Sequence, residues 1–188
     1  RGETFTKEVD LRDADFQDEI VFDGAVFHSN CQMDEINFDH AEFEGAEFKG
    51  DINFRSSIFD KMANFSHATF QAESIFEGTR FVQGADFEGA IFHKKGAFER
   101  ARFEQNVYFN RVEFNDVADF DNCHFEEHGD FRNVNFIGPV EFRSVRSGPE
   151  GPKDKGQELH GVHLTSSKFG AQADFGESQF GSFSGQYI

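Results

Sequence analysis

The sequence predicts an all-β fold, a four-sided parallel β-helix (a solenoid) that forms one domain over residues 1–188. Three observations predict it. Phenylalanine accounts for 28 of the 188 residues and recurs at alternating steps of six and five from Phe48 to Phe142. A small residue stands two positions before most of these phenylalanines, and polar residues or glycine follow them. A repeat of eleven residues, built from two such units, indicates a fold made of stacked copies of one element.

Each unit is predicted to be a short extended segment. In Ala85-Asp86-Phe87 the first and third side chains point inward, because side chains alternate between the two sides of a strand. The outward residue between them is expected to vary freely, as Glu47 and Ile58 illustrate. An α-helix would need apolar residues at steps of three and four. Steps of five and six would scatter the phenylalanines around a helix.

Four units are expected to close one coil of about 22 residues, with coils stacked about 4.8 Å apart. Each phenylalanine then lies above the phenylalanine of the coil before it. One column is predicted to contain Phe48, Phe70, Phe92, Phe114 and Phe136. Burial of each ring contributes about 1.5–3 kcal/mol, and offset stacking adds about 0.5–1.5 kcal/mol per pair.

The units resemble those of the pentapeptide repeat proteins, written Ala-Asp/Asn-Leu/Phe-x-x. The matching triplets are Ala14-Asp15-Phe16, Ala63-Asn64-Phe65, Ala85-Asp86-Phe87, Ala118-Asp119-Phe120 and Ala173-Asp174-Phe175. The resemblance covers nearly the whole chain and implies a right-handed quadrilateral β-helix. The chain departs from the family pattern by inserting a sixth residue in every second unit. A triangular β-helix is the alternative.

The frame begins near Phe5 or Leu11 and lacks one inserted residue between Phe38 and Phe48, which is expected to tighten one turn. Residues 143–158 are rich in Gly, Pro and charged residues and are predicted to leave the solenoid as an exposed loop. The spacing then resumes at Leu159, Leu164, Phe169, Phe175 and Phe180.

Residues 181–188 are rich in Gly and Ser and end the chain. The end of a solenoid is a sheet edge that must be covered. Phe183, Tyr187 and Ile188 are therefore predicted to cap this end or to contact a second copy. The family resemblance implies that a homodimer through one solenoid end is common.

The formal charge of −17 argues against binding of nucleic acid or anionic membranes and favours a protein partner with a basic surface. No stretch approaches the roughly 18 apolar residues of a membrane-spanning helix. The two cysteines, Cys31 and Cys123, each precede a core position by two residues and are predicted to be small buried side chains. The low cysteine content and the absence of a signal-peptide pattern favour the cytoplasm.

The charge is uneven along the chain. Residues 1–50 carry 14 acidic and 4 basic side chains, a net charge of −10. The middle of the chain carries Arg80, Lys94, Lys95, Arg100 and Arg102, which stacking should bring onto neighbouring sides. These five residues are a candidate patch for an anion or a partner, although a solvated mixed surface is the simpler explanation.

One motif matches a catalytic pattern. His124-Phe125-Glu126-Glu127-His128 fits the zinc-protease string H-x-x-E-H, which requires a helix to place both histidines on one face. Because Phe125 is a core position of the repeat, no helix and no zinc protease are expected. His160 and His163, beside the predicted loop, are expected to be solvated and not to bind a metal. The carboxylates mostly occupy outward or turn positions, so solvated faces account for them.

These observations favour a non-catalytic protein without cofactor or metal, which acts as a rigid interaction or scaffold module. One alternative comes from the resemblance, because the quinolone-resistance members of the family mimic duplex DNA and bind DNA gyrase. The acidic charge fits that role, whereas its concentration near the N-terminus does not. A polysaccharide-active β-helix enzyme is a second, weaker alternative.

Overall fold

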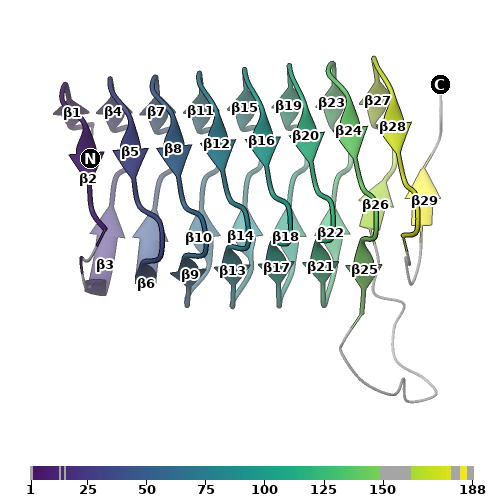
Figure 1. Cartoon of the computed structure of the whole chain (residues 1–188), viewed down its shortest axis with the longest axis horizontal. Coiled ribbons are helices and arrows are strands. Elements are labelled where there is room, and N and C mark those ends of the chain that lie inside the picture. Colours follow the sequence, from purple (N-terminus) through teal and green to yellow (C-terminus); the bar gives the residue numbers. More distant parts are fainter. Residues whose placement is uncertain (1, 13, 15, 149–161, 179–182, 186–188) are drawn as a thin grey trace.

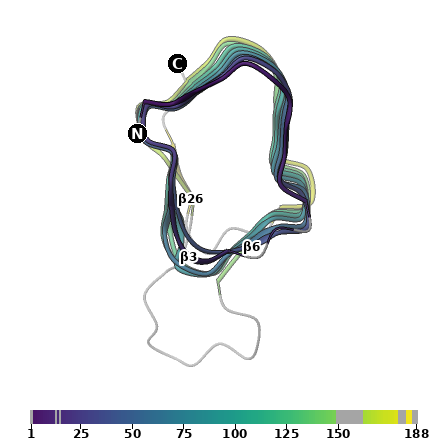
Figure 2. The same ribbon diagram turned by 90° about the vertical axis from the view of Figure 1, so that its left-hand side faces the viewer.

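The computed structural model describes residues 2–12, 14, 16–148, 162–178 and 183–185. These residues wind into one solenoid whose successive coils are joined by parallel strand pairs (Figure 1). Seen from the N-terminal end, the coil has four sides and turns clockwise as it recedes, so it is right-handed (Figure 2). The described residues contain no helix long and apolar enough to cross a membrane. The predicted quadrilateral β-helix is confirmed, and the triangular alternative is wrong.

We number the four sides as faces 1 to 4 in chain order. Faces 1 and 2 are eight-stranded sheets. The strands of face 1 are β1 (Thr4–Phe5), β4 (Val26–Phe27), β7 (Glu47–Phe48), β11 (Thr69–Phe70), β15 (Ile91–Phe92), β19 (Glu113–Phe114), β23 (Asn135–Phe136) and β27 (Lys168–Phe169). Those of face 2 are β2 (Val9–Asp10), β5 (Cys31–Gln32), β8 (Ile52–Asn53), β12 (Ser74–Ile75), β16 (Gly96–Ala97), β20 (Ala118–Asp119), β24 (Val140–Glu141) and β28 (Ala173–Asp174).

Faces 3 and 4 belong to one 13-stranded sheet, because two longer strands cross the corner between them. These two are β3 (Phe16–Val21) and β6 (Asn37–Glu42). Face 3 continues through β9 (Ile58–Phe59), β13 (Arg80–Phe81), β17 (Arg102–Phe103), β21 (His124–Phe125) and β25 (Arg146–Ser147). Face 4 continues through β10 (Ala63–Asn64), β14 (Ala85–Asp86), β18 (Val107–Tyr108), β22 (Gly129–Asp130), β26 (Val162–Leu164) and β29 (Phe183–Gly185).

The phenylalanine rings form columns inside the solenoid. The predicted column on face 1 is confirmed, because Phe48, Phe70, Phe92, Phe114 and Phe136 are partners in successive strand pairs. Their neighbouring rings are stacked, with centroids 4.5–5.4 Å apart. Rings of different columns meet edge to face, so the interior is a lattice of stacked and T-shaped aromatic contacts.

The alternation of five and six residues corresponds to two kinds of corner. From Phe43 onward each five-residue step within the regular repeat contains a tight turn, as where the N–H of Ala68 donates to the carbonyl of Phe65 at 3.1 Å. His67, the third residue of that turn, has a φ of 58°, which is typical of a type II turn. Six-residue steps instead pass through open bends, such as the one around Asp60 and Lys61. The inserted residue therefore widens every second corner and leaves the coil four-sided.

The predicted tightening between Phe38 and Phe48 is wrong in detail. Without the inserted residue, β6 continues straight from face 3 onto face 4 for six residues. The adjacent strand β3 matches it through a register shift between Phe16 and Glu19. The corner between faces 3 and 4 is therefore flattened at the N-terminal end, and outward side chains of β3 and β6 come to lie side by side.

The predicted start of the loop at residue 143 is also wrong. Arg146–Ser147 form β25, which pairs with β21, and Val145 is buried. A valine at the small position and a serine at the phenylalanine position keep the chain on the solenoid until Gly148. The remainder of the predicted loop and Leu159 lie outside the described residues. Phe169 and Phe175 resume the columns, with rings 5.2 and 5.4 Å from Phe136 and Phe142.

Both cysteines are buried and free, which confirms their predicted role as small core side chains. The thiol of Cys123 donates to the carbonyl of Phe98 at 2.9 Å. Ser57 and Thr79 make the equivalent bond on face 3, to the carbonyls of Met33 and Phe54. Burial raises the pKa of Cys31 to about 12 and that of Cys123 well above its usual range.

Candidate functional site

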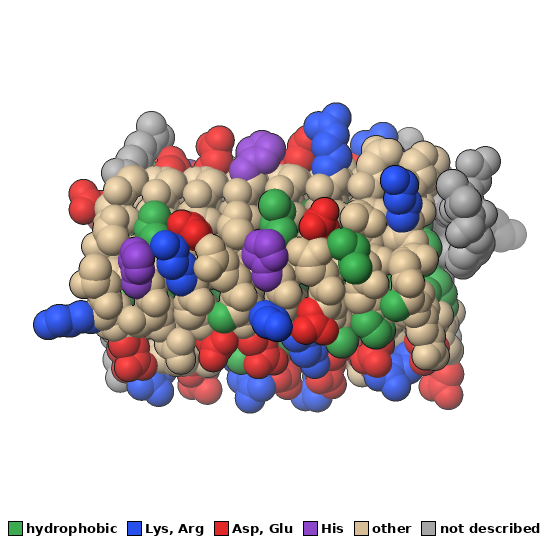
Figure 3. Space-filling model, turned by 90° about the horizontal axis from the view of Figure 1, so that it is seen from above, with side chains coloured by type: hydrophobic (Ala, Val, Ile, Leu, Met, Phe, Trp, Pro, Cys, Tyr) green, Lys and Arg blue, Asp and Glu red, His purple; other side chains and the backbone are tan. Residues whose placement is uncertain are grey.

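The chemistry of this molecule lies on the outer faces, where each face presents rows of side chains at matching positions of successive coils. Face 1 has few charges. Its first outward row is Thr4, Val26, Glu47, Thr69, Ile91, Glu113, Asn135 and Lys168. Viewed from above, charged side chains are sparser across the middle of the molecule than along its lower edge (Figure 3). Charged side chains are therefore distributed unevenly over the outer surface.

On faces 2 and 4 many outward Asp and Asn side chains accept a hydrogen bond from the backbone of the turn that follows them. The side-chain oxygen of Asp86 accepts from the N–H of Glu88 at 2.7 Å, and Asn53 and Asn64 bond in the same way two residues ahead at 3.0 Å. This bond forms an Asx turn at the entry to the tight corner. The expectation that the outward residue varies freely is therefore wrong at these positions of faces 2 and 4. The sequence signal for this turn-forming role was an Asp or Asn directly before a phenylalanine that begins a five-residue step.

The predicted basic patch is split between faces. Arg80 and Arg102 are partners in the β13–β17 pair on face 3, as stacking predicted. Arg100 lies in the turn between faces 2 and 3, whereas Lys94 and Lys95 lie in the bend between faces 1 and 2.

Carboxylates neutralise most of these cations. Arg80 Nε lies 2.5 Å from Glu104 Oε1, Arg102 Nε donates to Glu126 at 2.8 Å, and Lys95 Nζ lies 2.9 Å from Asp119. Arg100 pairs with Glu99 at 2.5 Å. The five residues thus form a mixed surface of alternating charge, and their role in anion or partner binding remains a prediction.

The H-x-x-E-H string has no helix to support it. His124 lies on β21, where its Nε2 is 2.8 Å from the carbonyl oxygen of Gly148. His128 lies in the bend before β22, with its ring centroid 5.6 Å from that of His163. The two histidines of the string are thus engaged in different places, as the repeat predicted. His160 lies outside the described residues.

Of the residues predicted for an end contact, Phe183 belongs to β29, whose backbone pairs with β26 at Val162. Tyr187 and Ile188 lie outside the described residues. A contact between copies through this end remains a prediction.

The N-terminal half of face 4 carries a group of acidic side chains. The positions of Glu42, Asn64 and Asp86 are aligned by direct strand pairing, and Glu44 and Glu88 follow two residues later. Burial, together with the charges of Glu88 and Glu44, raises the pKa of Asp86. These carboxylates therefore act on one another along the face. Arg111 approaches from the C-terminal side and pairs with Glu88 at 2.6 Å.

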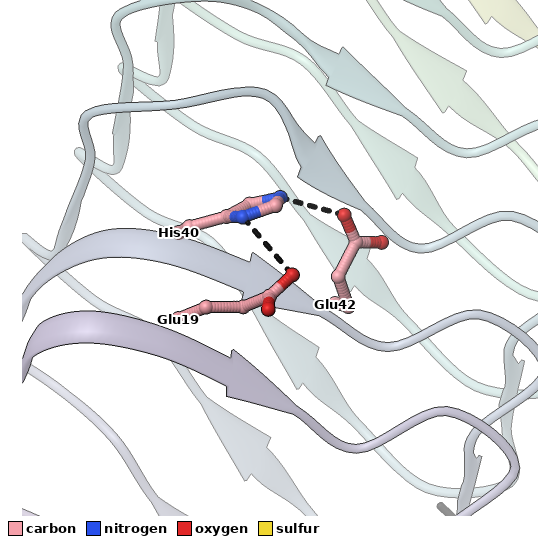
Figure 4. Close-up of side chains that lie close together, drawn as sticks. All are labelled: Glu19, His40 and Glu42. Atoms are coloured by element: carbon pink, nitrogen blue, oxygen red, sulfur yellow. Dashed lines mark hydrogen bonds and ion pairs between the residues drawn. The ribbon is translucent and has the colours of Figure 1, made fainter.

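A second feature of face 4 is a cluster made by β3 and β6. Glu19 and His40 are partners in the strand pair, and Glu42 lies two residues after His40 on the same side of β6. His40 Nδ1 is 3.3 Å from Glu19 Oε1, and His40 Nε2 is 2.7 Å from Glu42 Oε1 (Figure 4). The sequence analysis did not identify these residues. The signal was the missing insertion, because it straightens β6 and aligns the three side chains.

A second group of carboxylates lies on face 2, at Asp119, Asp121 and Glu141. Two cations already pair with it. Lys95 contacts Asp119 at 2.9 Å, and Arg143 contacts Asp121 at 2.5 Å and Glu141 at 3.0 Å. This group is a surface ion-pair network that joins neighbouring coils.

A shallow hollow of about 610 Å³ opens on face 2 near the N-terminus, beside Asp10, Arg12, Asp34 and Glu35. Three carboxylates line it, and a glycosidase-like site would need two of them to act as an acid and a base or nucleophile. However, Arg12 binds Asp10 at 2.6 Å and lowers the pKa of that carboxyl to about 2. Asp10 is therefore a poor proton donor at neutral pH.

A comparison with protein families agrees with this architecture. The family described as pentapeptide repeats (9 copies) matches residues 43–91 and 98–146. No curated protein sequence matches the chain. Among solved structures, the chain is similar to HetL, a pentapeptide repeat protein involved in heterocyst differentiation regulation from the cyanobacterium Nostoc sp. strain PCC 7120. That likeness has a TM-score of 0.28 at 8% identity and covers 95% of this chain and 87% of HetL. The family match spans more than half of the sequence, and the chain therefore belongs to the pentapeptide repeat family.

Proposed function

We propose that this protein is a non-catalytic interaction module, a stiff rod that binds a protein partner with a basic surface. The observation that carries the proposal is the contrast between inside and outside. The interior repeats one ring lattice from coil to coil, whereas the outward rows differ between faces in charge and side-chain type. Pentapeptide repeat proteins are generally non-catalytic, which agrees with this role.

Rigidity follows from the way the coils are joined. In the middle of the rod, each coil bonds to the next through parallel strand pairs on all four faces and through a stacked ring in each column. A partner that binds several coils therefore meets side chains at spacings set by the backbone, about 4.8 Å per coil. Little conformational entropy is lost on binding to such a preorganised surface.

The charge of the partner follows from the N-terminal half of face 4. Glu42, Glu44, Asp86 and Glu88 lie on this face, and the pKa of Asp86 responds to its acidic neighbours. A basic surface placed here gains from charge complementarity, which speeds association and selects the partner. We therefore assign the partner contact to this half of face 4.

Charge reversal on matched faces tests the proposal. One double variant, Glu44→Lys with Glu88→Lys, reverses two charges on face 4. The matched control, Glu47→Lys with Glu113→Lys, reverses two charges on face 1. Immobilised wild-type protein should capture a partner protein from a lysate of its source. The affinity of that partner should fall at least tenfold for the face 4 double variant and should be unchanged for the face 1 double variant. If every captured protein binds both double variants equally well, the proposal is wrong.

One observation favours a second role, mimicry of duplex DNA towards DNA gyrase. The eight strands of face 1, about 4.8 Å apart, give a rod of roughly 38 Å. The formal charge of −17 then corresponds to about one charge per 2.2 Å, near the one per 1.7 Å of duplex DNA. Against it, pairs such as Arg102–Glu126 and Arg143–Asp121 neutralise much of the middle of the rod. A gyrase supercoiling assay with and without a fluoroquinolone decides, because a mimic must change supercoiling at micromolar protein.

A further inference from the structure

The cluster of Glu19, His40 and Glu42 brings one nitrogen and two oxygen ligands together on the outer surface. One imidazole nitrogen and one oxygen from each glutamate lie within 4.8 Å of one another. Ligand atoms around a tetrahedral zinc ion are about 3.3 Å apart, given metal–ligand distances near 2.0–2.2 Å. Small rotations of these side chains would close that gap, and Glu19, whose side chain is 56% exposed, is free to make them. Figure 4 shows both carboxylates directed at the imidazole.

The charge balance separates this cluster from the group at Asp119, Asp121 and Glu141. Each carboxylate of that group has a cationic partner, Lys95 or Arg143. In the part of the chain that the structure describes, the ion pairs of Glu19 and Glu42 are made with His40. With a neutral imidazole, two negative charges therefore face each other across the ring. A divalent cation would balance them.

The donor set also indicates which cation. Ca²⁺ and Mg²⁺ prefer all-oxygen sites, whereas an imidazole nitrogen with carboxylates suits Zn²⁺ and its neighbours in the first transition row. We propose that Glu19, His40 and Glu42 form a surface binding site for a divalent transition-metal ion of the Zn²⁺ class. The Nε2 of His40 and the carboxylate of Glu42 are the first ligands. Glu19 either completes the set or accepts the Nδ1–H of His40, as carboxylates beside metal-bound histidines do.

Such an ion would join the first coils of the solenoid. Glu19 lies on β3, and His40 and Glu42 lie on β6, so the ion would tie two strands of successive coils at the flattened corner. Because the metal binds the folded arrangement and not the separated strands, it should stabilise the N-terminal coils. Amides of β3 should then exchange their hydrogens more slowly when the metal is bound.

The test is calorimetric titration of the chelator-treated full chain with ZnCl₂, CoCl₂ and CaCl₂, with the visible spectrum of Co²⁺ as a second readout. We expect one equivalent of Zn²⁺ or Co²⁺ to bind at least tenfold more tightly than Ca²⁺. His40→Ala and Glu42→Gln should each weaken Zn²⁺ binding at least tenfold and remove the Co²⁺ bands. His28→Ala on face 1 is the matched loss of an exposed imidazole, and Glu113→Gln is the matched loss of a carboxylate. Both should bind Zn²⁺ as the wild type does.

The variants are surface changes, and circular dichroism verifies that they fold. Two results overturn the proposal. One is Zn²⁺ binding that is equal in wild type and His40→Ala, which would mean loose association with the acidic surface. The other is Ca²⁺ binding as tight as Zn²⁺ binding, which would mean that the carboxylates act without the imidazole.

Discussion

The ring lattice makes a quantitative prediction for Phe87, which lies in the middle of the face 4 column. Its ring is stacked between Phe65 at 5.0 Å and Phe109 at 4.8 Å, and it meets Phe76 and Phe98 edge to face at 5.5 Å. The side chain is fully buried. Phe87→Ala therefore removes a complete ring and leaves a cavity lined by the neighbouring rings of all four columns. We expect the free energy of unfolding to fall by about 3–5 kcal/mol, the upper range for a buried large-to-small change.

Phe5 provides the matched comparison at the end of the rod. It is only partly buried, stacks on one side against Phe27 at 4.7 Å and meets Phe22 at 5.9 Å. With one stacked neighbour and part of its surface in water, Phe5→Ala should lower the free energy of unfolding by about 1–2 kcal/mol. Phe87→Leu keeps most of the volume and should lower it by about 1.5 kcal/mol.

Urea denaturation followed by far-ultraviolet circular dichroism measures these differences as shifts of the midpoint. Hydrogen exchange shows which coils lose stability, and we expect faster exchange in the coils that contain Phe65, Phe87 and Phe109. The reasoning is refuted if Phe87→Ala and Phe5→Ala are equally destabilising, because the energy would then not reside in the stacked columns. It is equally refuted if Phe87→Leu is as damaging as Phe87→Ala.

Three further predictions concern the turns, the thiols and the basic residues. Gly78 has a φ of 64° and room for a Cβ, so Gly78→Ala should lower the free energy of unfolding by only about 1–2 kcal/mol. Gly84→Ala should lower it far more in the same urea assay, because its Cβ would lie 2.1 Å from the carbonyl oxygen of Asn106. Neither Cys31 nor Cys123 should react with a thiol reagent at pH about 8 until urea is added, because both thiols are buried and their raised pKa keeps them protonated. Unfolded thiols ionise above pH about 8.5 while folded Cys31 does not, so its contribution to stability is lost as pH rises past that value. Cys31→Ala should therefore flatten the alkaline fall of the melting temperature, and identical pH profiles would contradict this. Arg80→Ala combined with Arg102→Ala should lower the free energy of unfolding by less than about 2 kcal/mol, since exposed ion pairs contribute little, and a larger loss on urea titration would show that these pairs hold the coils together.

Particular residues show which parts of the fold could be predicted from the sequence and which could not. The Phe48–Phe136 column and the buried positions of Cys31 and Cys123 were predictable, because a parallel coil with a fixed repeat places equal positions above one another. The continuation of the solenoid through Val145 to Gly148 was not predicted. Serine replaces phenylalanine at Ser147, so the pattern ends there while the backbone pairing of β25 does not. The turn-forming role of Asp86 was missed for a related reason, since its bond to the N–H of Glu88 depends on a corner that only every second unit makes.

The spacing of aromatic and small residues by itself determined the coil length, the four columns of rings and which side chains face inward. The reason is that burial of the large rings dominates the free energy of folding and recurs with a strict period. The tertiary structure decided which outward residues meet. Glu19 and His40 are far apart in the chain and become neighbours only because β3 and β6 pair with a register shift across a flattened corner. The corners likewise place Lys94 and Lys95 in the bend between faces 1 and 2, away from Arg80 and Arg102 on face 3. Outward polar groups are solvated almost equally well in many arrangements, so the sequence pattern alone places little constraint on their contacts.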